Sequence, residues 1–239
     1  MANINTQPDN RSLGVRDLLL MALTVSSGAI DSISYLALGK IFTAFMTGNF
    51  VFLGLLVAGS GTQSLISVVV SIALFAAGVY LAARIVGPSR GSGVWPRRAT
   101  VALGFTAVAQ ACFLAVWVAA GGQPLGGVVA VLIALWALAM GIQTGTVFSL
   151  GLPGVFTTAA TATLTVLMSD VAHPRSSAAE KRRLAGVLVS LFVGATVGAL
   201  LLSYAPTYAP AFPLVVTVLV VATAAIALRG IHGFAQKSG

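Results

Sequence analysis

Residues 36–49 read LALGKIFTAFMTGN, and residues 150–163 repeat much of that phrase as LGLPGVFTTAATAT, 114 positions further along the chain. The identical pairs are Leu36 and Leu150, Leu38 and Leu152, Phe42 and Phe156, Thr43 and Thr157, and Thr47 and Thr161. A repeat of this length indicates that the protein consists of two related halves. In a membrane protein, such internal symmetry is typical of proteins that move a solute across the bilayer.

The sequence around the two copies is strongly apolar. Hydrophobic residues make up 58% of the 239 positions and charged residues only 8%, and the mean hydropathy is +1.00. A soluble domain carries about a quarter charged residues, so the composition indicates an integral membrane protein. The apolar runs have the length of helices and are rich in Gly, Ala, Leu and Val, which predicts an all-α bundle rather than a barrel of short alternating strands.

Several functional classes have no support in the sequence. The net charge of +8 does not indicate nucleic-acid binding, because the basic runs at 97–98 and 181–183 lie between apolar segments, where such residues set the topology. A single cysteine, Cys112, excludes a disulfide within the chain and a cysteine metal cluster, and His173 and His232 are far apart. Motifs for ATP, dinucleotides or serine hydrolysis are absent. We therefore expect no enzyme, no cofactor, no metal and no nucleic-acid partner.

Eight apolar segments can be drawn, each near the ~20 residues that span a bilayer. They cover about 17–38, 41–59, 64–87, 99–120, 125–152, 154–171, 184–204 and 211–229. If all eight cross from a cytoplasmic N-terminus, the basic residues divide into eight inside and five outside. If segments 41–59 and 154–171 re-enter or form broken spans with their predecessors, twelve lie inside and only Lys40 lies outside. The positive-inside rule favours the second arrangement, with both termini in the cytoplasm.

We therefore predict about six transmembrane helices plus two broken or re-entrant segments, arranged as a 3+3 inverted repeat. Each repeat copy follows a helix breaker, Gly39-Lys40 in the first half and Pro153-Gly154 in the second. The expected organisation is a cytoplasmic tail (1–14), a first membrane repeat (15–120), a second membrane repeat (121–229) and a second cytoplasmic tail (230–239). An arrangement with eight crossings would give parallel halves, and segment length alone leaves it open.

Asp31 is the one carboxylate of five that lies well inside a predicted span and not at its end. An acid at membrane depth is costly unless it is paired or protonated, so it is a functional hypothesis by default, and it would suit coupling to protons. The alternative is structural: a helix cap or a hydrogen bond to Ser32, Ser34 or the broken segment. In the second half, the corresponding GIQTG at 141–145 replaces the acid with an amide or a hydroxyl.

Hydroxyl and amide side chains in both copies are the other candidates for a solute site. Thr43 and Thr47 are four residues apart and would share a helix face, as would Thr157 and Thr161. The predicted site consists of Asp31, Thr43, Thr47, Asn49, Gln143, Thr157 and Thr161. Alternatively, threonine hydroxyls bond the carbonyl one turn back, and Gln143 bonds a neighbouring helix. A GxxxG motif at 194–198 is interpreted as internal packing.

The phrase GAIDSISY at 28–35, followed by Phe42-Thr43 and by MTGN at 46–49, resembles the YoaK-like family of uncharacterised bacterial multi-pass inner-membrane proteins. The second half adds GIQ at 141–143 and Thr157-Thr158 with Thr161. The resemblance covers about residues 15 to 229. It implies a place in the bacterial inner membrane, but no substrate, because the function of that family is unknown.

These observations lead to one leading hypothesis, a membrane transporter or channel for a small solute that is coupled to protons through Asp31. The partners would be the lipid bilayer, an unidentified solute and protons, with a homo-oligomer left open. The alternative is a non-transporting membrane scaffold or assembly protein, which predicts an exposed, self-complementary face of small residues.

Overall fold

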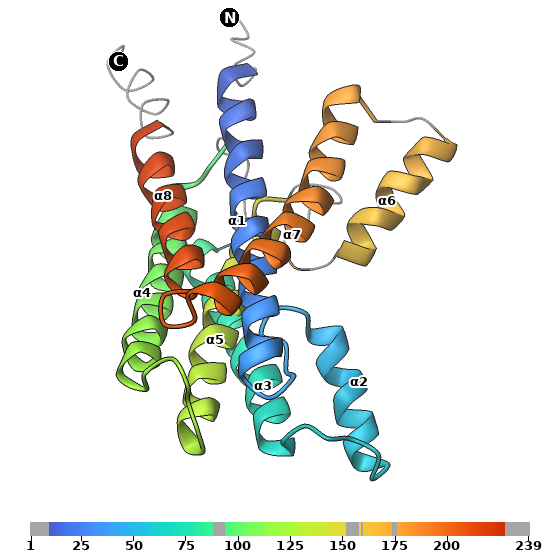
Figure 1. Cartoon of the computed structure of the whole chain (residues 1–239). Helices are drawn as coiled ribbons and strands as arrows, with labels where there is room; N and C mark the ends of the chain where they lie inside the picture. Colours follow the sequence, from blue (N-terminus) through green and yellow to red (C-terminus); the bar gives the residue numbers. More distant parts are fainter. Residues whose placement is uncertain (1–9, 88–93, 152–157, 159, 174–175, 228–239) are drawn as a thin grey trace, which may run out of the picture.

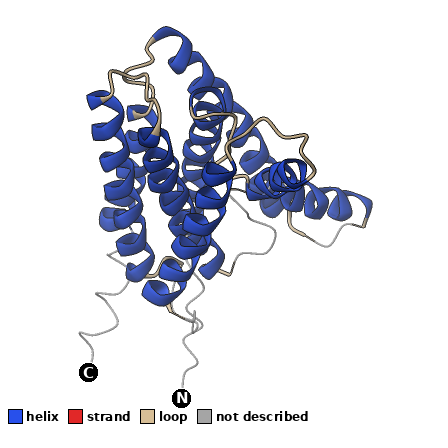
Figure 2. Ribbon diagram, turned by 90° about the horizontal axis from the view of Figure 1, so that it is seen from below, coloured by secondary structure: helices blue, strands red, loops and turns tan. Residues whose placement is uncertain are grey.

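The computed structural model describes residues 10–87, 94–151, 158, 160–173 and 176–227. Within these ranges the chain forms eight α-helices and no strand (Figures 1 and 2). The helices are α1 (Asn10–Ala37), α2 (Met46–Val57), α3 (Leu65–Val86), α4 (Arg97–Ala119), α5 (Gly127–Ser149), α6 (Ala160–Ala172), α7 (Ala178–Tyr204) and α8 (Ala211–Ala227). Each of the eight predicted segments corresponds to one helix, and the predicted all-α class is confirmed.

The two repeat copies supply the two shortest helices. In the described part of the chain, α1, α3, α4, α5 and α7 are long and apolar enough to cross a membrane. Helices α2 and α6 have 12 and 13 residues, which at ~1.5 Å per residue is roughly 18–20 Å. A bilayer core is about 30 Å thick, so neither short helix crosses it alone.

Each short helix continues in the direction of the helix before it. In Figure 1, α1 and α2 both run downward, and α5 and α6 both run upward. The break after α1 has a local cause, because Gly39 and Lys40 both have positive φ values, of 82° and 60°. The Lys40 N–H bonds the carbonyl of Tyr35 at 3.1 Å, which closes the helix in a Schellman-type turn. The breaker predicted at Gly39-Lys40 is confirmed, and the one at Pro153-Gly154 lies outside the described residues.

Two helix pairs, α1 with α7 and α3 with α5, form the centre of the bundle, and the two helices of each pair cross while the chain runs in the same general direction in both. Small residues allow the close approach: Gly194 lies against the Val25 backbone, and Gly141 lies against the Phe75 carbonyl and Gly78. Because Gly198 of the 194–198 motif also faces α1, the interpretation of this motif as internal packing is confirmed. Further contacts join α4 to α5, α1 to α8, α4 to α8, α2 to α3 and α6 to α7.

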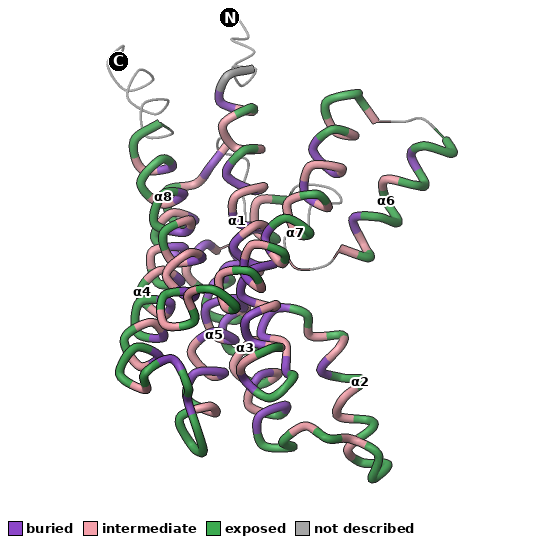
Figure 3. The backbone as a smooth tube through the Cα atoms, viewed as in Figure 1, coloured by how far each residue is buried: buried purple, intermediate pink, exposed green. Residues whose placement is uncertain are grey.

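Burial is highest in the two helices that open the two halves of the chain. In both α1 and α5, half of the most apolar 18-residue window is buried, more than in the other three long helices. Figure 3 shows these buried stretches in the middle of the bundle, where α5 lies behind α1. The aromatic centre of this core is the stacked pair of Phe113 from α4 and Trp136 from α5, with ring centroids 3.6 Å apart.

Charged residues gather at the end of the bundle where α1 begins. This end carries the last turn of α3 and the first turns of α4 and α7 (Figure 1). Its described basic residues are Arg16, Arg84, Arg97, Arg98, Lys181, Arg182 and Arg183. Ion pairs tie the elements together there, with Lys181 of α7 at 3.2 Å from Asp170 of α6 and Arg183 at 3.9 Å from Asp17 of α1.

The α1–α7 contact gives a test of the packing. Replacing Gly194 by alanine places a Cβ against the backbone of Val25, so the helices must separate. We expect this overpacking to destabilise the protein by about 1–3 kcal/mol, measured as a lower Tm in detergent. Gly104→Ala is the matched control, because nothing lies within 4 Å of its added Cβ and alanine favours a helix. Equal Tm values for the two variants would contradict the close contact.

Candidate functional site at the break between the first two helices

The Asp31 carboxylate caps the segment that leads into α2. Its Oδ1 accepts hydrogen bonds from the backbone N–H groups of Thr43 at 3.0 Å and Ala44 at 2.8 Å. Phe45, the N-cap residue of α2, provides no side-chain bond of its own. None of the ion pairs among the described residues involves Asp31. The Asp31 side chain is half-buried. Its hydrogen bonds to the broken segment agree with the structural alternative drawn from the sequence.

Asn49 holds the same segment from α2. Its Nδ2 donates to the Phe42 carbonyl at 2.6 Å, and its Oδ1 accepts from the Phe42 N–H at 3.1 Å. Ser71 of α3 donates to the same carbonyl at 2.7 Å and accepts from Asn49 Nδ2 at 3.1 Å. Side chains from three helices therefore satisfy the backbone of residues 42–44, which is not helical and which a bilayer would otherwise leave without partners.

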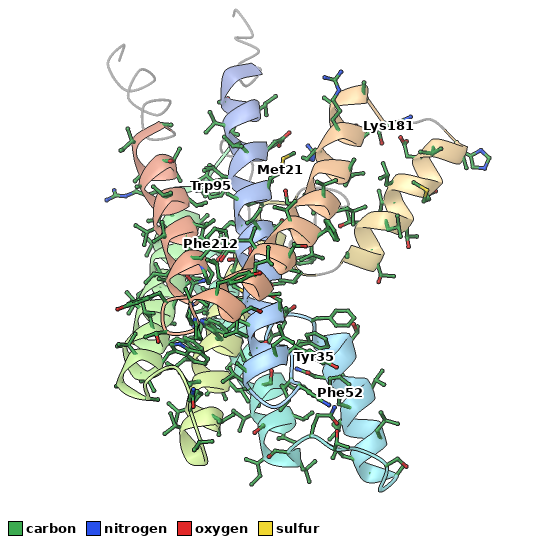
Figure 4. The ribbon with its side chains drawn as sticks, viewed as in Figure 1. Met21, Tyr35, Phe52, Trp95, Lys181 and Phe212 are labelled. Atoms are coloured by element: carbon green, nitrogen blue, oxygen red, sulfur yellow. The ribbon has the colours of Figure 1, made fainter. Side chains whose placement is uncertain are left out.

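Aromatic rings cover this polar network. The Phe42 ring stacks on Tyr35 of α1 at 5.0 Å and on Phe52 of α2 at 5.9 Å. Figure 4 labels Tyr35 and Phe52, which lie where the end of α1 meets α2. Phe45 adds an edge contact to Phe42 at 5.2 Å. The segment between α1 and α2 is thus fixed through its backbone by polar side chains and through its own side chains by ring stacking.

Three of the predicted site residues come together here: Asp31, Thr43 and Asn49. Thr43 lies before α2 and is buried, whereas Thr47 lies within α2 and is exposed. The prediction that Thr43 and Thr47 share a helix face is therefore wrong, because the chain does not become helical until Met46. The Thr43 hydroxyl is buried without a hydrogen-bond partner among the described residues.

The other predicted residues lie elsewhere. Gln143 of α5 donates to the Leu23 carbonyl of α1 at 3.2 Å, and Leu23 is about 12 Å of helix rise from Asp31. Thr161 is exposed on α6, and its carbonyl accepts from the Thr165 hydroxyl at 2.9 Å, as expected for threonines that bond one turn back. Thr157 lies outside the described residues.

The second half has a contact at the position that corresponds to Asp31. GAID at 28–31 matches GIQT at 141–144, so that Thr144 corresponds to Asp31. This alignment has an offset of 113 residues, one less than the offset of 114 between the two repeat copies, by which Ala44 corresponds to Thr158. The Thr144 and Thr158 hydroxyls are 3.1 Å apart in the structure and hydrogen-bond each other. The two halves therefore make a similar link with different chemistry, a carboxylate to backbone N–H groups in one and a hydroxyl pair in the other.

Ser71 was not predicted from the sequence, because one serine in an apolar segment is a common packing residue. Its signal becomes visible only when α3 is known to pack against α2. Over the described ranges, no group of three or more His, Cys, Asp or Glu side chains gathers in a way that could hold a metal ion.

The long apolar helices and the buried hydrogen-bond network define a multi-pass, all-α membrane protein. Residues 19–224 match the family described as "Protein of unknown function (DUF1275)". The chain is also 35% identical, over 156 residues, to the UPF0700 transmembrane protein YoaK of Bacillus subtilis (strain 168), a match that covers 65% of this chain and 67% of that protein. The chain belongs to the DUF1275 family, and the family resemblance seen in the sequence is confirmed. No solved structure matches it.

The network around Phe42 gives a second test. Asn49→Ala removes both bonds to the Phe42 backbone and leaves the partly buried Phe42 N–H without a partner, which we expect to cost roughly 1–3 kcal/mol. Thr47→Ala, two residues away on the exposed face of α2, should change stability by no more than about 0.5 kcal/mol. Unfolding titrations of both variants in detergent micelles measure the difference. A destabilised Thr47→Ala with an unaffected Asn49→Ala would refute a stabilising role for the hydrogen bonds between Asn49 and the Phe42 backbone.

Proposed function

We propose that this protein is a membrane transporter or channel for a small solute, built as a 3+3 inverted repeat. The carrying observation is that three helix contacts have a matching contact when α1–α4 is compared with α5–α8, whereas α3 with α4 has no match of similar extent. The contact of α1 with α7 matches that of α5 with α3, α1 with α8 matches α5 with α4, and α2 with α3 matches α6 with α7. In Figure 1, corresponding helices run in opposite directions. Inverted halves with interrupted helices are a common architecture of secondary transporters.

Asp31 supplies the group that responds to protons. A hydrogen bond to a charged carboxylate is roughly twice as strong as one between neutral groups, so proton uptake weakens the attachment of Asp31 Oδ1 to residues 43 and 44. Because these residues lead directly into α2, a weaker attachment favours movement of α2 relative to α1. No basic side chain among the described ion pairs competes for the carboxylate, which leaves the backbone N–H groups as its partners.

The charge distribution supports a bacterial inner-membrane location with both termini in the cytoplasm. The described basic side chains at the ends of α1, α3, α4 and α7 lie at one end of the bundle, and the positive-inside rule assigns such an end to the cytoplasm. We assign the protein no enzymatic role.

The alternative of a scaffold protein has less support. It predicts an exposed face of small residues, but Gly194 and Gly198 face α1 within the chain. Buried glycines cannot provide a dimer face.

The role of Asp31 can be tested in proteoliposomes. Currents on a solid-supported membrane, recorded for a panel of amides, polyols, amino acids and monocarboxylates, identify a transported solute and its pH dependence. We expect Asp31→Asn to remove the pH dependence, because the amide cannot titrate. Asp17→Asn is the control, since Asp17 lies at the start of α1 in ion pairs with Arg16 and Arg183. Solute currents in Asp31→Asn that follow pH as in the wild type would overturn the proton role.

The inverted arrangement can be tested by cysteine labelling in a Cys112→Ser background. In the six-crossing arrangement, an exposed cysteine at Gln123 lies outside the cell, whereas eight crossings would place it inside. We expect Gln123→Cys to react with a membrane-impermeant maleimide in intact cells, like Tyr208→Cys, which is outside in both arrangements. Ala179→Cys should react only after permeabilisation. Labelling of Gln123→Cys only in permeabilised cells would support parallel halves instead.

A further inference from the structure

Polar side chains without partners are buried where α5 contacts α1 and α4, a region called here the junction of α1, α4 and α5. Ser27 and Gln143 are completely buried and Gln110 is 1% exposed. The unpaired atoms are Ser27 Oγ, Gln110 Oε1 and Nε2, Trp136 Nε1 and Gln143 Oε1, none of which has a hydrogen-bond partner in the described part of the chain. A buried polar atom left unpaired costs about 1–3 kcal/mol, so a cluster of them requires an explanation.

Contacts between the helices place these atoms along about two turns of α5. Gln143 Nε2 donates to the Leu23 carbonyl, and Ser27 lies one turn further along α1 on adjoining surface. On the other side, the Thr106 hydroxyl bonds the Ala139 carbonyl at 3.4 Å. This bond brings α4 against the turn of α5 that precedes Gln143.

Gln110 lies on the same face of α4 as two residues with known contacts. Thr106 is one turn before it and Phe113 is about one turn after it. Phe113 stacks on Trp136 at 3.6 Å. Gln110 is therefore held opposite the stretch of α5 between Trp136 and Ala139, between one and two turns from Gln143.

Neighbouring buried hydroxyls do not share this feature. The Thr24 hydroxyl bonds the Leu20 carbonyl at 2.8 Å, and the Thr146 hydroxyl bonds the Ile142 carbonyl at 2.7 Å. Ser26, beside Ser27, faces α8 and bonds the Pro213 carbonyl at 3.2 Å. Pairing is therefore complete for these hydroxyls on the same helices and incomplete for those at the junction of α1, α4 and α5.

We propose that Ser27, Gln110, Trp136 and Gln143 form the solute site, and that the solute is small, uncharged and rich in both hydrogen-bond donors and acceptors, as amides and polyols are. The amide oxygens offer acceptors, the Gln110 amide and the Trp136 indole offer donors, and the Ser27 hydroxyl offers either. None of these four side chains carries a charge. Asp31, one turn beyond Ser27, is engaged with the Thr43 and Ala44 N–H groups.

The proposed site adds a binding place and a solute class to the proposed transport function. The route of the solute to this site rests on that proposed function. Helices α1 and α5 correspond to each other in the proposed repeat, so a site between them lies where the two halves meet, as solute sites of inverted-repeat transporters do. Because all four side chains are buried, a solute reaches them only when the halves move.

Binding can be measured separately from transport with the full chain in detergent. The probes are urea, acetamide and glycerol, with acetate and methylammonium as charged counterparts, and the readout is the rise in Tm with probe concentration. We expect the uncharged probes to stabilise the wild type. Gln110→Met removes the amide that would hydrogen-bond the probe, so we expect it to weaken probe binding about tenfold or more. The Tm of Gln110→Met without probe should equal or exceed that of the wild type, because methionine preserves volume and removes an unpaired amide.

Matched variants and a flux assay separate the outcomes. Thr146→Val removes a buried hydroxyl that is already paired, and should bind the probes as the wild type does. If Gln110→Met does not fold, Ser27→Ala tests the same site with a smaller change.

Three results would each overturn this site. They are no stabilisation by the uncharged probes, undiminished binding in Gln110→Met and Ser27→Ala, and tighter binding of the charged probes. Binding without flux in proteoliposomes would retain the site and reject transport, whereas flux unchanged by Gln110→Met would retain transport and reject the site.

Discussion

The structure depends on one constraint: a backbone that leaves the helix at membrane depth must find partners for its N–H and C=O groups within the protein. The chain breaks after α1 because Gly39 and Lys40 turn it into the left-handed region. The exposed groups of Phe42, Thr43 and Ala44 are then satisfied by side chains from α1, α2 and α3. The position of α2 follows from those bonds, since its packing against the rest of the bundle is through α3.

This constraint changes the meaning of the polar residues that the repeat contains. Asn49 resembles a solute ligand in the sequence, yet its amide is engaged with the Phe42 backbone and Ser71. Among the described residues, the Thr43 hydroxyl is unpaired in the repeat, but five unpaired polar atoms lie at the junction of α1, α4 and α5, where no conspicuous motif marks them. In a bundle with so few charges, a hydrogen bond already made indicates a structural role, and a group of buried polar atoms without one requires an explanation, for which we propose the solute site.

The sequence predicted the helices well because their signal is local. Apolar runs gave all eight segments, and Gly39-Lys40 gave the first break. The prediction that Thr43 and Thr47 share a helix face was wrong. Residues 42–45 stay out of the helix because the Asp31 carboxylate, distant in sequence, accepts hydrogen bonds from the Thr43 and Ala44 N–H groups, and local propensity does not report such a contact. The partnership of Asn49 with Ser71 joins residues 22 apart, and Gln110 is the one amide side chain in its apolar segment, with no motif around it. Neither position is fixed by spacing along the chain, because each depends on which helices pack together.

The two halves differ in the chemistry of the link that holds the segment before the short helix. The Thr144–Thr158 hydroxyl pair corresponds to the contact of Asp31 with residue 44, but a threonine hydroxyl neither gains nor loses a proton in the range where proteins work, whereas a carboxylate is a titratable group. In the proposed mechanism, protonation therefore acts on this link in the first half and not on its counterpart in the second. Ser27, in the proposed site, lies one helical turn from Asp31 on neighbouring surface of α1. A shift of α1 that accompanies release of residues 43 and 44 would reach Ser27 directly, so the same helix can connect the charge state of Asp31 to the shape of the site.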